Sequence, residues 1–220
     1  MPGTSLWLLP PPTHPLYPAL QTLISRTLPA AFPTETAALS PHFFAPHITL
    51  TSGIAPEVYG ADPQAWLDSL PLESCVGKVR VRFTGVASQD VFVRRCFIRV
   101  AASDEGVRQL AVLARAHGVY AGDEKKAREW LGEWERRCGP HVSLVYGSMP
   151  MDEDKQQEVV RIVTEAGITL SEEKRDRVQK EEEDEEANDE SWNGWDGGVL
   201  WLVQTDEPTA EWTPIVTRQL

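Results

Sequence analysis

The hydrophobic positions of the chain recur with two different periods, which predict a mixture of helices and strands. Apolar residues spaced three or four positions apart share one face of a helix. This spacing predicts helices over residues 15–28, 63–70 and 123–137, a helix capped by Asp104 that carries Val107, Leu110, Ala111 and Ala114, and a helix with Val159, Ile162, Val163 and Ala166 that ends at Gly167. Trp130 and Trp134 lie four residues apart, and we interpret them as packing anchors.

Short apolar runs and strict alternation predict the strands. They cover residues 5–9, 46–53, 78–83, 91–100, 140–146, 198–205 and 214–220. The turn-like residues Ser88, Gln89 and Asp90 predict a hairpin between the third and fourth of these strands. Helix, strand and hairpin recur in both halves of the chain. We therefore expect an α+β fold of two similar lobes of antiparallel sheet, with outer helices around a central cleft, and residues 1–220 as one bilobal domain.

One predicted strand has a basic face. Val79, Val81 and Phe83 alternate with Lys78, Arg80 and Arg82. The basic side chains could line a cleft for an anion, or they could simply face solvent, which is the usual situation for such a face.

Composition and charge narrow the class of protein. The chain has 220 residues, of which 41% are hydrophobic, and 8 Trp, which indicates a folded core. The net charge is −12, and residues 172–190 hold eleven acidic and four basic residues, a local charge of −7. We interpret residues 171–190 as an acidic flexible insertion. Long nucleic acid is not expected as a partner, since its binding requires many cationic contacts with phosphates.

The sequence predicts a protein without cofactor, metal or disulfide framework. Cys75, Cys96 and Cys138 have no C-x-x-C spacing and are interpreted as reduced structural thiols, although one bridge is possible. The Cys and His residues do not show zinc-ligand spacing. Apolar runs stay below the roughly 18 residues that a membrane span needs, and the start lacks a signal-peptide layout. We expect a soluble intracellular monomer.

Two short boxes nearly repeat each other. They are Pro46-His47-Ile48-Thr49-Leu50 and Pro140-His141-Val142-Ser143-Leu144. Positions i and i+2 of a strand share a face, so each histidine is expected to project together with its hydroxyl while the apolar neighbours are buried. The alternative is that both boxes are ordinary strand starts, each with a tolerated Pro and a half-buried His.

The duplicated pair suits cleavage of a phosphodiester. Imidazole titrates near neutral pH and can act as a general base or a general acid. Two imidazoles on opposite sides of phosphorus can activate water and protonate the leaving oxygen, while the hydroxyls hold the non-bridging oxygens. His14, His42 and His117 lack a hydroxyl two residues later, and surface or capping positions are expected for them.

Two such boxes about ninety residues apart, in a chain of this size, resemble the two-histidine phosphoesterase superfamily. Within it the chain is most similar to the fungal and plant 2′,3′-cyclic-nucleotide 3′-phosphodiesterases. The resemblance covers both boxes, the early strand Ser5-Leu6-Trp7-Leu8-Leu9-Pro10 and the terminal strand. It implies metal-independent hydrolysis of small cyclic-phosphate nucleotides to 2′-phosphates, with ADP-ribose 1″,2″-cyclic phosphate from tRNA splicing as a further substrate. It also leaves a Golgi association open.

The resemblance also implies residue roles. His141 would activate water and His47 would protonate the 3′-oxygen, although sequence alone does not decide which histidine does which. Thr49, Ser143, Tyr146 and Trp7 would bind the substrate. Tyr146 is out of phase with Ser143 in a regular strand, so it reaches the same face only if the strand twists or ends before Gly147.

Two other functions compete with this one. A related RNA-end phosphodiesterase or 2′-5′ RNA ligase-like enzyme would need a basic track for the polymer, and the net charge disfavours such a track. A non-catalytic interaction protein would use the acidic segment as its partner surface. Hydrolysis of cyclic mononucleotides, compared with that of an oligomer, separates these possibilities.

Overall fold

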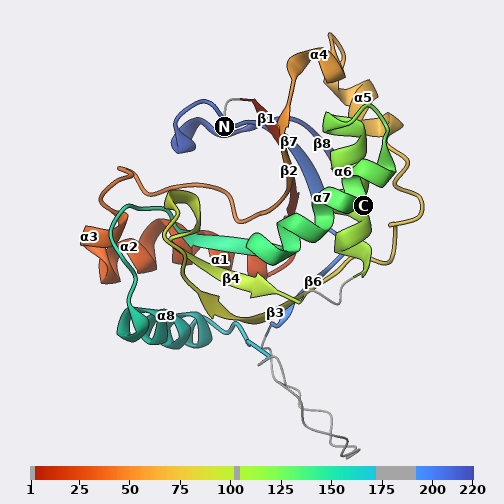
Figure 1. The fold of residues 1–220 in the computed structure, drawn as a ribbon. Helices are drawn as coiled ribbons and strands as arrows, with labels where there is room; N and C mark the ends of the chain where they lie inside the picture. Colours follow the sequence, from red (N-terminus) through yellow and green to blue (C-terminus); the bar gives the residue numbers. More distant parts are fainter. Residues whose placement is uncertain (1–2, 102–104, 172–191) are drawn as a thin grey trace, which may run out of the picture.

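The computed structural model describes residues 3–101, 105–171 and 192–220 and confirms the predicted α+β class (Figure 1). These residues form one curled antiparallel sheet with the order β6-β3-β4-β5-β2-β1-β7-β8. The strands are β1 Thr4–Leu9, β2 Ile48–Ile54, β3 Arg80–Ala87, β4 Cys96–Val100, β5 His141–Val145, β6 Gly194–Asp196, β7 Val199–Gln204 and β8 Pro214–Gln219. The sequence did not predict β6. The N-cap expected at Asp104 and residues 172–190 of the acidic insertion lie outside the described residues.

The sheet consists of two four-stranded halves that meet at a narrow seam. β2 and β5 are the central neighbours, and in the described chain their ladder is the single pair Ile48–Val142. By contrast, β1 and β7 pair over six residues from Thr4 to Leu9. The two expected lobes are therefore the two halves of one continuous sheet. Beyond Ile48 and Val142, the described residues of β2 and β5 are not paired with each other.

The helices include every one predicted within the described residues. They are α1 Leu16–Thr22, the π-helix η1 Leu23–Thr27, α2 Leu28–Ala31, α3 Pro33–Thr36, α4 Pro56–Tyr59, α5 Pro63–Ser69, the 3-10 helix η2 Phe92–Arg94, α6 Glu105–Val119, α7 Glu124–Arg137, α8 Glu153–Glu165 and the 3-10 helix η3 Thr209–Glu211. α6 packs on β2 and carries α7 outside it, while α5 packs on β8 and α8 on β3. The Asp123 side chain caps α7. Trp130 and Trp134 pack against the main core, as expected of packing anchors, and also stack on each other. Gly167 follows the end of α8 with a φ of +83°, as expected for a C-terminal cap.

β1 is buried on both of its faces. Leu6 and Leu8 belong to the main core, on the helix-covered face. On the opposite face Trp7 and Leu9 form a second cluster with Ala45 and Val203. Because alternate side chains of a strand point to opposite faces, this second cluster marks the sheet face that carries the boxes.

The prediction of a strand over residues 91–100 was wrong in its first half. Phe92–Arg94 form the 3-10 helix η2, and the strand begins at Cys96. The cause is the buried side chain of Arg95, which pairs with Asp90 at 2.9 Å and donates to the carbonyl of Gly147 at 3.0 Å. These bonds hold the chain in a turn. The run of apolar residues in this segment gives no sign of such a turn. The β3–β4 hairpin itself is confirmed.

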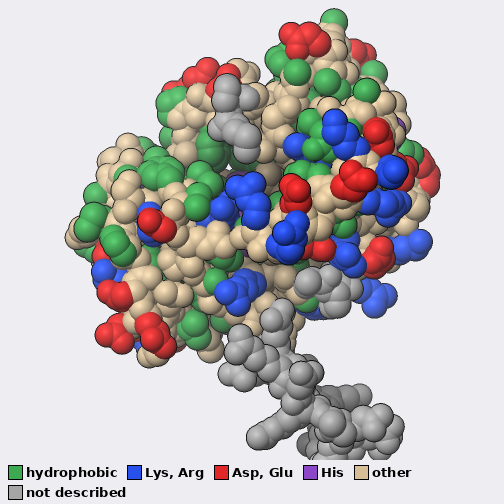
Figure 2. Space-filling view, viewed as in Figure 1, with side chains coloured by type: hydrophobic (Ala, Val, Ile, Leu, Met, Phe, Trp, Pro, Cys, Tyr) green, Lys and Arg blue, Asp and Glu red, His purple; other side chains and the backbone are tan. Residues whose placement is uncertain are grey.

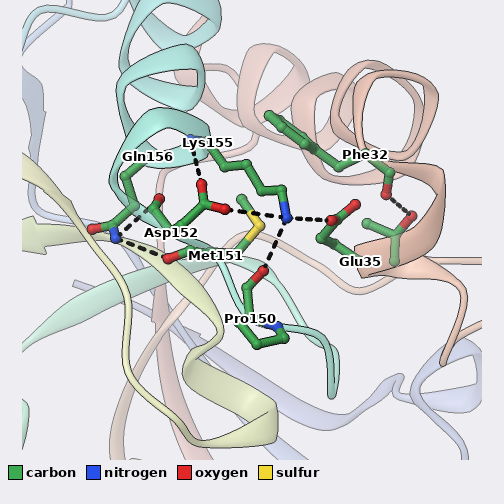
Figure 3. Close-up of polar contacts among 8 residues, drawn as sticks. Phe32, Glu35, Pro150, Met151, Asp152, Lys155 and Gln156 are labelled. Carbon is green, nitrogen blue, oxygen red and sulfur yellow. Dashed lines mark hydrogen bonds and ion pairs between the residues drawn. The ribbon is translucent and has the colours of Figure 1, made fainter.

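The chain after β5 is tied to the helices at the other side of the seam. Figure 3 shows Lys155 at the start of α8 between the carboxylates of Glu35 and Asp152. The Lys155 ammonium lies 2.9 Å from a Glu35 carboxylate oxygen. The Glu35 side chain is 9% exposed, whereas the Lys155 side chain is 36% exposed, so the ion pair is buried on its carboxylate side only. A Cβ added at Gly147 would lie 2.1 Å from the Glu35 carbonyl oxygen, so only glycine fits this close approach.

The three cysteines are all free, as expected. Burial raises the pKa of the Cys96 thiol to about 12 and raises that of Cys75 and Cys138 as well, so the thiol form is favoured.

Candidate active site

The two histidine boxes meet at the seam of the sheet. Ile48 and Val142, which pair across it, are fully buried in the main core. The residues flanking this pair therefore point to the opposite face. In an antiparallel register His47 lies on the side of Ser143, and Thr49 lies on the side of His141. The fold thus places two imidazoles and two hydroxyls in alternation around one point.

His47 is held firmly in the second cluster. The residue is 5% exposed, and its ring stacks on Trp7 with a centroid distance of 3.7 Å and an angle of 11° between the planes. Nδ1–H donates to the carbonyl of Ala45 at 2.7 Å, which leaves Nε2 as the second ring nitrogen. Burial lowers the pKa of His47 to about 4, and the charge of His141 contributes in the same direction. The two rings are therefore close enough to sense each other's protonation.

His141 repeats this arrangement in the other half. Its Nδ1–H donates to the carbonyl of Gly139 at 2.9 Å, again two residues upstream of the histidine. The Phe97 ring lies at a centroid distance of 5.0 Å. Burial lowers the pKa of His141 to about 4, and the positive charge of Arg94 adds to this effect. Both imidazoles are thus favoured in the neutral form, with Nε2 able to accept a proton.

The two hydroxyls differ in their surroundings. Ser143 is buried, and its Oγ donates to the carbonyl of Val93 at 2.8 Å. Thr49 is half-buried, and its side chain makes no hydrogen bond with another described residue. The Thr49 hydroxyl can therefore donate to a ligand directly. The Ser143 hydroxyl must first give up its hydrogen bond to the Val93 carbonyl.

Tyr146 reaches the site because β5 ends at Val145. It stacks on Phe44 with a centroid distance of 4.0 Å, and its phenol lies close enough to Ser143 for that hydroxyl to affect its pKa. Burial raises the pKa of Tyr146 well above its usual value, with the Ser143 hydroxyl opposing this, so the phenol stays protonated.

His42 is a positioning residue that sequence reasoning missed. It is 5% exposed, so the expected surface or capping position was wrong. Its Nδ1–H donates to the Ile24 carbonyl at 2.8 Å, and its Nε2 accepts the Tyr146 backbone N–H at 3.1 Å. The Ile24 carbonyl is open to His42 because Leu28 donates instead to Leu23 in the π-helix and Pro29 has no N–H. Of the other histidines, His14 does take a capping position, since its Nδ1 accepts from Leu16 N–H.

Two tryptophans border the site, and the sequence pointed to one of them. Trp7 is 1% exposed, and its ring stacks against the His47 ring. Trp212, in the loop between β7 and β8, contacts both Trp7 and Tyr146 with its ring. The sequence carries no local signal for Trp212, because its loop reaches the site only through the folding of the β7–β8 hairpin.

The described residues also line cavities outside the point where the two boxes meet. The basic face of β3 lines a cavity of about 710 Å³ away from the boxes, with Lys78, Arg80 and Arg82 in its wall and Arg82 paired with Asp196. A cavity of about 280 Å³ adjoins the second box at Gly139 and Pro140. Among these residues, His, Cys, Asp and Glu do not gather in threes, and the helices are too short or too polar to cross a membrane.

Comparison with known proteins identifies the family to which the chain is similar. A family model described as "Cyclic phosphodiesterase-like protein" matches residues 1–220. A 2′,3′-cyclic-nucleotide 3′-phosphodiesterase from Neurospora crassa is 51% identical over 227 residues and covers both chains completely. Proteins of the same name from Phaeosphaeria nodorum and Yarrowia lipolytica are 37% and 27% identical, over 221 and 237 residues, and cover 98% or more of each chain.

Proposed function

The chain belongs to the cyclic phosphodiesterase-like protein family and is an enzyme, and on that premise we propose that it hydrolyses 2′,3′-cyclic nucleotides to nucleoside 2′-phosphates without a metal ion. The observation that carries the proposal is the pair of imidazoles at the seam. Each has its Nδ1–H bound to a carbonyl two residues upstream, and each has its Nε2 left for proton transfer. Two groups that exchange protons on either side of one phosphorus supply the acid and the base that this hydrolysis needs.

The proposed reaction is a single in-line displacement. His141 Nε2 removes a proton from water, whose oxygen attacks phosphorus and forms the new P–O bond. The bond from phosphorus to the 3′-oxygen breaks, and His47 donates a proton to that oxygen. The product carries its phosphate on the 2′-oxygen. His141 ends protonated and His47 ends neutral, and exchange with solvent restores the starting state.

The assignment of base and acid is supported by the charges around the rings. Arg94 acts on His141 and disfavours its imidazolium, which suits a base that must be neutral before the reaction. His47 must be protonated to act as the acid. A bound cyclic phosphate carries a negative charge next to the ring and raises the pKa of His47 from its value in the empty site.

The hydroxyls and the phenol are proposed to bind the non-bridging oxygens. Thr49 Oγ1–H is available for this bond, and Ser143 Oγ–H becomes available if it leaves the carbonyl of Val93. The phenol of Tyr146 is held beside Ser143 and supplies a further O–H donor. Donors that are already in place stabilise the charge that develops on the phosphoryl oxygens. Trp7 is proposed to act by supporting His47.

The proposed site is complete within one chain, with one histidine from each half of the sheet, so we propose that residues 1–220 act as a single bilobal domain and a monomer. ADP-ribose 1″,2″-cyclic phosphate presents the same five-membered cyclic phosphodiester and is proposed as a second substrate.

The test uses 2′,3′-cyclic AMP in the presence of EDTA. We expect 2′-AMP as the product, and a loss of turnover of about 10²–10⁴-fold for His47→Asn and for His141→Asn. Asparagine keeps an N–H for the carbonyl that each histidine binds, but it does not transfer protons. His117→Gln, on α6 outside the site, is the control and should retain activity.

Three results would overturn the proposal. These are 3′-AMP as the product, full loss of activity in EDTA, or a folded His47→Asn protein with most of its activity. An oligonucleotide that ends in a 2′,3′-cyclic phosphate is assayed in parallel. A strong preference for this oligomer would favour an RNA-end enzyme instead.

A further inference from the structure

Trp212 contacts the site from a loop that neither histidine box belongs to. It follows η3 in the connection between β7 and β8, at the edge of the sheet. Its ring meets Trp7 at a centroid distance of 5.6 Å and an angle of 65°, and Tyr146 at 6.2 Å and 67°. Trp7 stacks on His47, and the phenol of Tyr146 lies close enough to Ser143 to be affected by its hydroxyl. Trp212 therefore touches a neighbour of each catalytic box.

Trp212 is also the most exposed ring of the three. Trp7 is 1% exposed and Tyr146 is 4% exposed, whereas Trp212 is half-buried. Its indole Nε1–H donates to the carbonyl of Glu207 at 2.7 Å, so the ring is fixed to its own loop. A fixed aromatic ring with open surface is suited to stacking against a flat ligand.

The opposite side of the site has a different chemistry. Arg99 is the cross-strand partner of His141 in β4 and is exposed, and Arg94 is close enough to influence the titration of His141. Arg99, Arg136 and Arg137 line the cavity of about 280 Å³ beside Gly139. Figure 2 shows Lys and Arg side chains, with Asp and Glu side chains among them, over the part of the molecule that β4 and α7 occupy in Figure 1. These guanidinium groups suit water and anions. Glu135 also lines this cavity, and the exposed ring of Phe92, two residues before Arg94 in sequence, contacts Tyr146.

We propose that Trp212 stacks against the nucleobase of the substrate and thereby selects nucleotides over base-free cyclic phosphates. The inference rests on the proposed function. In the in-line displacement the leaving 3′-oxygen lies at His47 and water lies at His141, so the nucleoside extends toward the His47 side. On that side the His47 ring stacks on Trp7, and Trp7 contacts Trp212.

The test compares Trp212→Leu with the parent protein on three substrates. They are 2′,3′-cyclic AMP, 2′,3′-cyclic CMP and glycerol 1,2-cyclic phosphate, which has the same five-membered ring but no base. Leucine keeps an apolar cover over Trp7 and Tyr146. We expect KM for cyclic AMP to rise about 5- to 150-fold, with a smaller rise for cyclic CMP, because a purine has the larger stacking surface.

The expected kcat stays within about threefold of the parent value, because stacking contributes equally to the bound ground state and the transition state. Kinetics on the base-free substrate should be unchanged, and Trp212→Phe should restore most of the affinity for cyclic AMP. Trp134→Leu is the matched control, since Trp134 lies on α7 and stacks on Trp130 outside the site.

The inference and the proposed function fail in different ways. If the parent protein hydrolyses none of the three substrates, the proposed function is wrong. If it hydrolyses them but Trp212→Leu leaves KM for cyclic AMP unchanged, the stacking role is wrong. A fall in kcat on all three substrates by the same factor would also overturn it, because that result indicates a purely structural cover.

Discussion

Acidification should destabilise the protein through His47 by an amount that the structure predicts. The pKa of His47 is about 4 in the folded protein against 6.5 in an unfolded chain. As the pH falls below 6.5, the unfolded chain binds a proton that the folded protein refuses. Stability is therefore lost progressively down to about pH 4, where the folded protein titrates too. At pH 4.5 this linkage amounts to about 2.5 kcal/mol of unfolding free energy.

His47→Asn isolates this contribution. Asparagine can keep the bond to the Ala45 carbonyl, but it does not titrate. Urea unfolding of both proteins is measured by circular dichroism at pH 7 and at pH 4.5. The acidic residues and the histidines that do not interact with His47 are common to both chains, so their contributions cancel in the difference between the two proteins.

Between the two pH values the parent protein should lose about 2.5 kcal/mol more than His47→Asn. A difference below about 0.5 kcal/mol would refute the reasoning, because it would mean that water reaches the imidazole in the folded state. The same neutral imidazole is the starting point of the proposed mechanism, so this measurement tests the site without any substrate.

Three further predictions follow from the contacts of the site. Gly147→Ala should destabilise the protein by about 1–3 kcal/mol in thermal unfolding, because its Cβ would meet the Glu35 carbonyl oxygen at 2.1 Å. The control Gly132→Ala lies in an open stretch of α7 and should stabilise the protein by about 0.5–1 kcal/mol. Equal effects of the two substitutions would contradict the packing described. His42→Leu should cost about 1–3 kcal/mol for each backbone group that it leaves without a partner and should lower kcat by displacing Tyr146; an unchanged kcat would show that Tyr146 needs no such support. The pH optimum of kcat should lie higher than the pH optimum of kcat/KM, because the bound phosphate anion raises the pKa of both imidazoles. Coincident optima in steady-state pH profiles would argue against an anion between the two rings.

Much of the secondary structure and the two histidine boxes could be predicted from local sequence patterns. The helical spacing of residues 15–28 and 123–137 and the alternation through residues 78–83 predicted real elements, because these patterns depend on neighbours within a few positions. The two boxes were found for the same reason. The two-residue period of a strand places each histidine beside its hydroxyl wherever the strand lies.

The tertiary structure alone decided how these pieces meet. The pairing of Ile48 with Val142, the contact of His42 with Tyr146 across 104 positions and the approach of Trp212 to Trp7 all join residues that are far apart along the chain. The turn at Phe92–Arg94 likewise depends on the bond from Arg95 to Gly147, 52 residues away. A local pattern sets which face a side chain occupies, but the strand or loop that comes to lie against that face is chosen by the packing of the whole chain.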